Sequence, residues 1–318
     1  MKESEVLNII KNTLSDNSYI GDDCAELKPF NLFITQDSLV ENIHFNTETT
    51  TPYQLGIKAV AVNISDLLTR LCKPMFISIG LSLPKNITSD FVTELYRGID
   101  SACIKYGVKV TGGDITGSEN IVISITAIGK RDYGYNTSRA FAKEGDYVVT
   151  TGFYGTSSAG LYALQNNLRV PEKLTGACLT PCAKYEEAEI IKNLADYDLA
   201  SADTSDGLAD TLFKIAEASG VSINVDYKNI PVLPEVKDFA KQNKLDEKQL
   251  VLWGGEDFEL IFCISEETFR KIDPAKFRFL GRAEAKTDTP HVKICYGKTF
   301  DIIDKNTVDN KTFNHFGG

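Results

Sequence analysis

Histidine is scarce in this sequence of 318 residues, which contains only three: His44, His291 and His315. We therefore do not expect a transition-metal centre built from several imidazoles. CxxC pairs are also missing. The seven cysteines are spread along the chain, and the closest two, Cys178 and Cys182, have no Cys or His partners at zinc-finger spacing. This pattern predicts free thiols in a reducing compartment.

Long apolar runs and an excess of basic residues are missing too. No segment approaches 18 consecutive apolar residues, and the N-terminus lacks the apolar centre of a signal peptide. Lys and Arg number 34 against 44 Asp and Glu, which gives a net charge of −10. This balance argues against a nucleic-acid or anionic-membrane partner. We expect a cytoplasmic protein that could bind nucleotides if divalent cations bridge the charges.

What the sequence does contain is a recurring carboxylate on a glycine turn. Glycine lets the backbone approach a ligand, and a neighbouring Asp or Glu supplies the hard oxygen ligands that Mg²⁺ and Ca²⁺ prefer. One Asp-Gly turn is ordinary turn chemistry without a function, but several with closely spaced carboxylates favour a cation site. The four stretches are Gly21-Asp22-Asp23, Gly112-Gly113-Asp114, Asp203-Thr204-Ser205-Asp206-Gly207 and Gly254-Gly255-Glu256-Asp257-Phe258-Glu259-Leu260.

The first half of the chain predicts alternating strands and helices. The clearest helix start is at Thr51, an N-cap residue followed by Pro at the first helical position and by Gln54 at the capping-box position. We expect helices over 4–14, 52–71 and 89–106, and strands over 31–36, 76–83, 108–111 and 120–129. This order predicts an α/β or α+β domain, residues 1–136, and places a polar linker within 131–145.

The second domain is predicted to cover residues 137–318. Its first strand, over 146–151, runs into a glycine-serine turn at 152–160, whose N–H groups could face a phosphate. The turn is neither a Walker A loop nor GxGxxG, so this signal is weak on its own. Further strands are expected near 199–202, 222–226, 258–264, 277–284 and 291–296, and helices near 183–195, from 208, near 246–252 and near 266–272.

The helix expected over 52–71 has two distinct stripes. The apolar one, with spacings of four, three and four, predicts a buried face: Val60, Ile64, Leu67 and Leu71. The polar one consists of Asn63, Asp66 and Arg70, and periodicity alone is compatible with either a site or a solvated face. Asp37 ends an expected strand, where open α/β sheets commonly carry ligand groups, although a helix or turn cap is the alternative.

Several collinear blocks together resemble the thiamine-monophosphate kinases, over nearly the whole chain. They include the four acidic stretches and add 35–45 (TQDSLVENIHF), 58–67 (KAVAVNISDL) and the closing Phe313-Asn314-His315-Phe316. The resemblance implies the two-domain fold shared with aminoimidazole ribonucleotide synthetase. In that fold an N-terminal α/β domain dimerises through its sheet, and a C-terminal α/β domain packs beside it.

The resemblance also implies a reaction, in which ATP gives its γ-phosphoryl group to thiamine monophosphate, with Mg²⁺, to form thiamine diphosphate and ADP. Transfer between two polyphosphate anions depends on positioning and charge neutralisation. Carboxylates on short turns suit that task, because Mg²⁺ takes a few carboxylates together with water and phosphate oxygens. No covalent nucleophile is expected.

Site residues follow from the resemblance, position by position. It implies metal ligands at Asp23, Thr35, Gln36, Asp37, Asp66, Asp114, Asp203 and Asp206. It implies ATP contacts at Gly113, Asp114, Arg139 and Ser205, and substrate contacts at His44, Glu256 and Phe313. Without it, His44 could be an exposed strand-end histidine and Arg139 a solvated linker charge. The chain departs from the family pattern at Gln36, Thr204, Phe258 and Asn310.

Three other kinds of protein remain as alternatives. Aminoimidazole ribonucleotide synthetase and selenophosphate synthetase share the fold and use ATP with Asp-bound Mg²⁺. The first is not expected to carry the Gly254–Leu260 block, and the second needs a reactive Cys or selenocysteine in a glycine-rich segment, whereas Cys24 lies inside the Gly-Asp-Asp turn. A catalytically silent nucleotide or thiamine-phosphate binder is the third possibility, and retention of every carboxylate argues against it.

Overall fold

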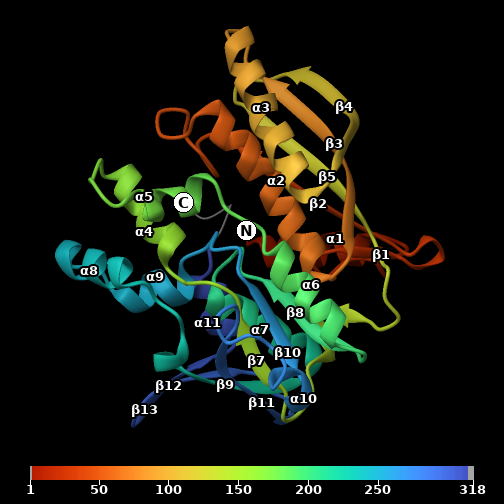
Figure 1. Ribbon diagram of the computed structural model, residues 1–318, viewed down its shortest axis with the longest axis vertical. Helices are drawn as coiled ribbons and strands as arrows, with labels where there is room; N and C mark the ends of the chain where they lie inside the picture. Colours follow the sequence, from red (N-terminus) through yellow and green to blue (C-terminus); the bar gives the residue numbers. More distant parts are fainter. Residues whose placement is uncertain (1, 314–318) are drawn as a thin grey trace.

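The computed structural model, described here for residues 2–313, contains two β-sheets (Figure 1). The first sheet has the order β1-β2-β5-β3-β4, in which only the β3–β4 pair is parallel. Its strands are β1 (Ala25–Leu27), β2 (Leu32–Val40), β3 (Lys73–Leu83), β4 (Lys109–Gly117) and β5 (Val122–Lys130). The helices of this half are α1 (Glu3–Thr13), η1 (Lys28–Phe30), α2 (Pro52–Thr69) and α3 (Ser89–Tyr106).

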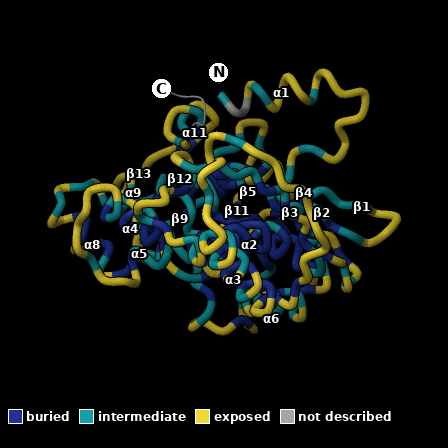
Figure 2. The backbone as a smooth tube through the Cα atoms, turned by 90° about the horizontal axis from the view of Figure 1, so that it is seen from above, coloured by how far each residue is buried: buried dark blue, intermediate teal, exposed yellow. Residues whose placement is uncertain are grey.

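Helix α2 begins as its sequence predicts. Thr51 accepts a hydrogen bond from the Gln54 N–H at 3.3 Å, and Gln54 Oε1 accepts one from the Thr51 N–H at 3.0 Å. The predicted capping box is therefore confirmed. Glycine lets α2 and α3 touch, because a Cβ at Gly98 would lie 2.0 Å from the Tyr53 carbonyl oxygen. Helix α2 belongs to the buried part of the molecule (Figure 2).

The second sheet has the order β13-β12-β9-β11-β7-β10-β8-β6. Its strands are β6 (Thr137–Ser138), β7 (Tyr147–Thr150), β8 (Leu199–Asp203), β9 (Val221–Asp226), β10 (Leu260–Ile264), β11 (Arg278–Lys286), β12 (Val292–Tyr296) and β13 (Thr299–Ile303). The helices are η2 (Arg139–Phe141), α4 (Thr156–Gln165), α5 (Glu172–Leu179), α6 (Tyr185–Leu194), α7 (Leu208–Ser219), η3 (Tyr227–Asn229), α8 (Pro234–Asn243), α9 (Glu247–Trp253), α10 (Glu266–Phe269) and α11 (Lys305–Lys311).

One hydrophobic core joins the two halves. It contains Ile64 and Leu67 of α2 together with Val149 of β7 and Phe262 of β10. Helix α2 contacts β2 and β5 on the first sheet, and β8, α5 and α6 of the second half. A separate core lies on the opposite face of the second sheet, under α7. The packing of α2 therefore fixes how the strand ends of the second sheet meet the first half of the chain.

Three expectations about local structure need correction. The stretch 112–114 is not a turn, because it lies inside strand β4, where Gly113 has φ of +156° and a Cβ would sit 1.8 Å from the Ile79 carbonyl oxygen. The polar linker contains β6, which pairs with β8. The sequence also did not predict β1, α5, α8, β13, α11 or the three short 3-10 helices η1, η2 and η3.

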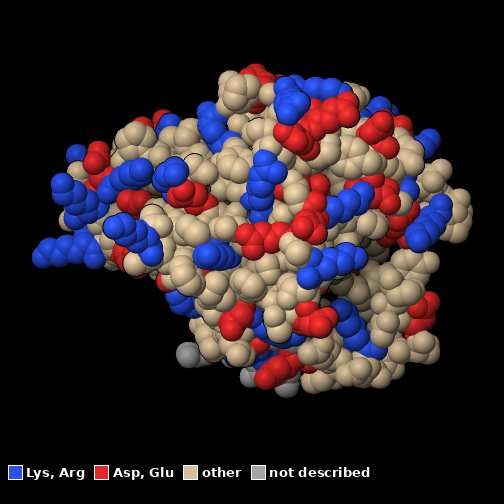
Figure 3. Space-filling view, turned by 90° about the horizontal axis from the view of Figure 1, so that it is seen from below, with Lys and Arg blue, Asp and Glu red and all other residues tan. Residues whose placement is uncertain are grey.

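The surface carries charges of both signs, and the start of the described chain contacts its last helix. On the face in Figure 3, basic and acidic side chains are interspersed. Lys2 donates from Nζ to the Asp309 carbonyl at 2.8 Å, so the start of α1 lies against α11. All seven cysteines are free, as predicted. Within residues 2–313, no helix is both long enough and apolar enough to cross a bilayer.

Candidate active site

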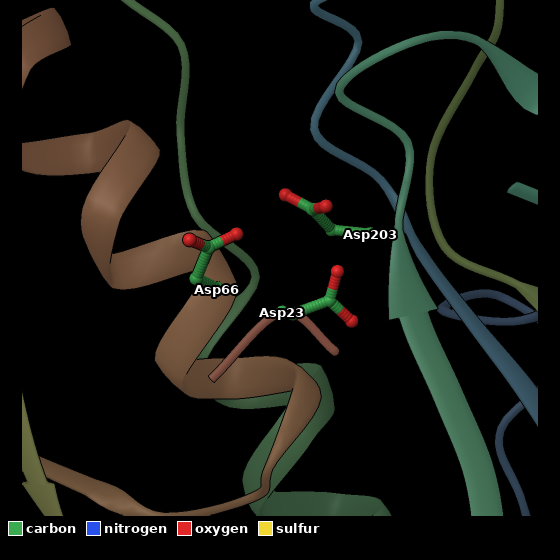
Figure 4. A group of neighbouring side chains, drawn as sticks. All are labelled: Asp23, Asp66 and Asp203. Atoms are coloured by element: carbon green, nitrogen blue, oxygen red, sulfur yellow. The ribbon is translucent and has the colours of Figure 1, made fainter. Parts of the chain in front are cut away.

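Three carboxylates from distant parts of the chain converge at one point (Figure 4). Asp23 lies in the loop before β1, Asp66 on α2, and Asp203 at the end of β8. One oxygen from each lies within 4.8 Å of those from the other two. Such close carboxylate oxygens repel one another unless a proton or a cation lies between them.

Two buried hydroxyl groups orient this cluster. Thr35 on β2 donates from Oγ1 to Asp66 Oδ2 at 2.6 Å, and Ser65 on α2 donates from Oγ to Asp203 Oδ2 at 2.6 Å. A bonded oxygen fixes the direction of the other oxygen of the same carboxylate. Thr35 and Ser65 therefore aim Asp66 and Asp203 at the shared point.

Asp37 and Asp206 extend the cluster. Asp37, on β2, is fixed through its backbone N–H, which donates to Asn63 Oδ1 at 3.0 Å. Its pKa is raised to about 6, chiefly by burial and then by the charges of Asp206 and Asp23. Asn63 and Asp66, both on the polar stripe of α2, therefore face this site rather than solvent.

Burial and crowding weaken the acidity of the innermost carboxyls. The pKa of Asp203 is raised to about 7 by burial first and then by the charge of Asp23, against a hydrogen bond from Ser65. The pKa of Asp66 is raised well above its usual range by burial, then by the charges of Asp37 and Asp203. The charge of Arg139 lowers the pKa of Asp203 but does not cancel the rise. The hard oxygens of these carboxyls fit a divalent cation such as Mg²⁺, which would keep them ionised.

Cationic side chains border the cluster on two sides. Arg139 of η2 donates to the Asp23 carboxylate, with Nε 3.3 Å from Oδ2. Arg70 pairs with Asp22 of the same turn at 2.5 Å. Lys214 of α7 places Nζ 2.8 Å from Asp206 Oδ2. Arg139 is therefore held at the site and is not a solvated linker charge.

Strand pairing brings the two acidic stretches of the second half together. Strands β8 and β10 are antiparallel, with Asp203 opposite Leu260. Just beyond the paired ends, the Glu256 N–H donates to the Ser205 carbonyl at 2.7 Å. The buried Thr204 hydroxyl, one of the departures from the family pattern, accepts from the Glu259 N–H at 3.0 Å. Thr204 therefore has a structural role in this turn.

The three acidic side chains of the Gly254–Leu260 stretch have different partners. Glu256 pairs with Lys58 of α2 at 2.9 Å, and Glu259 pairs with Lys184 at 2.9 Å. Asp257 accepts the N–H groups of Gly155 at 2.9 Å and Ser157 at 3.0 Å. These N–H groups are therefore occupied by a carboxylate, and the prediction that this turn offers them to a phosphate is wrong.

Comparison with known proteins identifies the family. Residues 21–130 match the family described as AIR synthase related protein, N-terminal domain. Thiamine-monophosphate kinase from Synechococcus elongatus is 32% identical over 258 residues, which are 78% of this chain and 77% of that protein.

The chain belongs to the thiamine-monophosphate kinase family.

Solved structures agree with this assignment. AaThiL complexed with AMPPCP and TMP superimposes with a TM-score of 0.86 at 30% identity, covering 99% of this chain and 97% of that one. Hydrogenase maturation protein HypE gives 0.71 at 19% identity, over 91% of this chain and 94% of HypE, and shows the fold alone. The fold implied by the resemblance to thiamine-monophosphate kinases is confirmed for the single chain, and the dimer stays a prediction.

Some of the metal and ATP ligands implied by the family pattern lie away from the Asp23–Asp66–Asp203 cluster of their own chain. Gln36 accepts a hydrogen bond from Thr126 Oγ1 at 2.8 Å, on the face of the first sheet opposite to Thr35 and Asp37. A metal contact through its side chain is therefore not supported, because neighbouring strand residues point to opposite faces. Gly113 and Asp114 lie on the exposed edge strand β4.

The predicted substrate residues are in different situations. His44 follows β2, and its Nδ1 accepts the Val40 N–H at 3.0 Å, while its carbonyl accepts from Lys58 at 3.2 Å. Phe313 is 63% exposed, and its predicted contact with thiamine stays a prediction. His315 and Phe316 of the closing block lie outside the described residues.

A cavity of about 610 Å³ lies beside the Asp22–Asp23 turn. It was not expected from the sequence, because its walls come from the N-terminal segment, β2, the end of α2 and the linker. Aromatic side chains line it at Tyr19, Phe33 and Phe141, next to the buried guanidinium of Arg70. Ser138 and Phe141, which flank Arg139, also face it. Its size suits a nucleoside.

Proposed function

We propose that this protein transfers the γ-phosphoryl group of ATP to thiamine monophosphate. The observation that carries the proposal is the convergence of Asp23, Asp66 and Asp203 from both halves of the chain. The relatives named thiamine-monophosphate kinase and the AaThiL complex with AMPPCP and TMP support the choice of substrates. In the step, a phosphate oxygen of the acceptor bonds to the γ-phosphorus as the bond to the β-phosphate oxygen breaks, which yields thiamine diphosphate and ADP.

We infer that the acidic cluster holds Mg²⁺. Asp23, Asp66 and Asp203 would be its central ligands, with Asp37 and Asp206 at the border and Thr35 beside them. Bound Mg²⁺ neutralises phosphate charge and orients phosphate oxygens. Thr35 and Ser65 orient the ligating carboxylates, and no side chain needs to form a covalent intermediate.

The nucleotide is proposed to lie across the Asp22–Asp23 turn. Arg139, already at Asp23, would donate to a phosphate oxygen, and Ser205 would contribute from the β8 side. The base would occupy the cavity lined by Phe33 and Phe141. The acceptor would then approach from the side of Glu256 and His44, with Phe313 covering its organic end.

We propose a homodimer formed through the first sheet. Its edge strand β4 is exposed, with Ile115 71% and Val110 44% accessible, and an unpaired edge of this kind invites pairing. Gly113 and Asp114, which do not reach the cluster of their own chain, would serve the nucleotide site of the second copy. Free cysteines support the cytoplasmic location, which stays part of this proposal.

The proposal is tested by supplying ATP, Mg²⁺ and one acceptor at a time. Thiamine monophosphate should be consumed with release of ADP, while thiamine and an aminoimidazole ribonucleotide precursor should not. ATP turnover with the precursor alone would favour a diverged synthetase. Tight nucleotide binding without turnover on any acceptor would identify a silent binder.

A further inference from the structure

Lys58 is a buried cation to which neither the sequence pattern nor the family resemblance assigned a role. It lies on α2 and is only 3% exposed. A buried ammonium group costs much free energy unless it is paired. Its Nζ lies 2.9 Å from Glu256 Oε2 and 3.2 Å from the His44 carbonyl oxygen. The two residues expected to contact the substrate from opposite halves of the chain therefore share this one cation.

Lys58 and Ser65 lie on one face of α2, and each contacts the second half of the chain. Lys58 and Ser65 are seven residues apart, so they lie on the same helix face, separated by about 10 Å along the axis. Ser65 bonds to Asp203 at the acidic cluster, whereas Lys58 bonds to Glu256. One face of α2 thus contacts the second half at two levels, whose separation is comparable to the length of thiamine monophosphate. If the phosphate lies at the cluster, the organic rings reach the level of Lys58.

Glu256 is itself held in an unusual conformation. Its φ is +64°, a left-handed conformation that is rare for residues other than glycine. Its N–H is fixed by the Ser205 carbonyl at 2.7 Å, and its carboxylate by Lys58. Strained backbone of this kind persists only where surrounding contacts hold it. Burial raises the pKa of the Cys178 thiol on α5 to about 11, while the charge of Lys58 lowers it and that of Glu256 raises it, so α5 lies beside the pair.

We propose that Lys58 is a positioning residue for the acceptor. It holds one oxygen of Glu256 and the His44 loop, so that the other carboxylate oxygen faces the cationic thiazolium ring or the amino-substituted pyrimidine of thiamine monophosphate. This inference rests on the proposed function. It assigns to the Lys58–Glu256 pair the selection of a positively charged, amine-bearing acceptor, separately from the groups that bind ATP.

A double-mutant cycle tests the role of Lys58. Lys58→Met should raise the KM for thiamine monophosphate at least about tenfold, because Glu256 loses its partner, while the KM for ATP changes less than about twofold. In a Glu256→Gln background the same change should alter that KM less than about threefold, because coupled residues are not additive. The matched control is Lys184→Met, which removes an ion pair of equal length to Glu259 and should lower the Tm without a selective rise in KM.

The outcomes separate the two proposals. Suppose that the wild-type enzyme turns over thiamine monophosphate. If the effects of the two substitutions are then additive, or if both KM values rise equally, the role of Lys58 is overturned and the proposed function stands. A wild-type protein that binds Mg²⁺ and ATP yet never phosphorylates thiamine monophosphate overturns the proposed function and, with it, the acceptor role of Lys58. Non-additive effects confined to the acceptor KM support it.

Discussion

Ser65 on α2 donates its hydroxyl hydrogen to Oδ2 of Asp203 at 2.6 Å, and this bond joins the first half of the chain to the end of β8. Both groups are buried, so if this hydrogen bond is lost, neither group can replace its partner with water at low cost in free energy. The carboxylate of Asp203 can point at Asp23 and Asp66 only when α2 is packed against the second sheet. The candidate site is thus a product of the contact between the two halves.

Ser65→Ala should weaken Mg²⁺ binding without destroying the fold. The substitution leaves Asp203 free to turn, and loss of such an orienting partner typically costs 10–100-fold in metal affinity. The measurement is the Mg²⁺ concentration that gives half-maximal activity. Ser101→Ala on α3 is the matched serine control and should behave as the wild type. An unchanged Mg²⁺ requirement in Ser65→Ala would show that Asp203 is oriented by other groups.

Metal binding should stabilise the folded protein. Adding Mg²⁺ at about 100 times its Kd should contribute about 2.7 kcal/mol and raise the Tm, because the ion binds the native cluster only. Asp66→Asn should lose most of this rise, since it removes a central ligand. Asp90→Asn on α3, outside the cluster, should retain it. Equal Mg²⁺-dependent shifts in Asp66→Asn and the wild type would place the ion elsewhere.

Asp257 predicts a pH-dependent stability. Its pKa is raised to about 7 by burial, although the N–H groups of Ser157 and Gly155 oppose the rise. The native state then holds this proton more tightly than the unfolded chain, so the stabilising contribution is present at low pH and is lost as the pH rises from about 4 through about 7.

Asp257→Asn isolates this effect. The variant should be less stable by about 1–3 kcal/mol, because its amide group faces an N–H donor at the start of α4. The Tm gap to the wild type should be larger at about pH 5 than at about pH 8, since only the wild type titrates. Asp246→Asn, at the exposed cap of α9, controls for loss of a helix cap. A gap that stays constant between about pH 5 and about pH 8 would mean that the carboxylate is ionised throughout.

If Asp114 serves the site of the second copy, two inactive variants should complement each other in mixed dimers. Asp114→Asn and Asp203→Asn should each be inactive as homodimers, because each removes a group from every site. If Asp114 serves the site of the second copy, mixed dimers contain one site with both wild-type carboxylates, and activity should return after the variants are unfolded and refolded together. Mixtures that stay inactive, or a single-chain mass in light scattering at micromolar concentration, would contradict the proposed dimer.

Local sequence signals predicted the elements that depend on neighbouring residues. Thr51 and Gln54 specify the start of α2. The polar stripe with Asp66 was compatible with a site or a solvated face, and in the structure it faces the site. The acidic turns were recognised because glycine and paired carboxylates are adjacent in the sequence. The family position of Gln36 did not predict the direction of its side chain, because strand alternation puts that side chain on the face opposite Thr35.

Other features depend on contacts between distant residues, which no local pattern encodes. The Lys58–Glu256 pair spans 198 positions, and a lysine within an apolar helix is ordinary in sequence. Asp257 was taken as part of an acidic site, yet it caps α4, about a hundred residues earlier in the chain. Gly113 was expected in a turn because the close approach of β3 to β4, which requires glycine there, is a property of the folded sheet.

The proposed function requires this cluster of carboxylates to carry phosphoryl transfer to thiamine monophosphate. The most direct test measures ADP and thiamine diphosphate together, from thiamine monophosphate and ATP with Mg²⁺, for the wild type and for Asp206→Asn. We predict equal amounts of both products, none of either when EDTA removes Mg²⁺, and turnover reduced by about 10²-fold or more in the correctly folded variant. Thiamine diphosphate formed at wild-type rate by Asp206→Asn, or ADP released without thiamine diphosphate, would contradict the account.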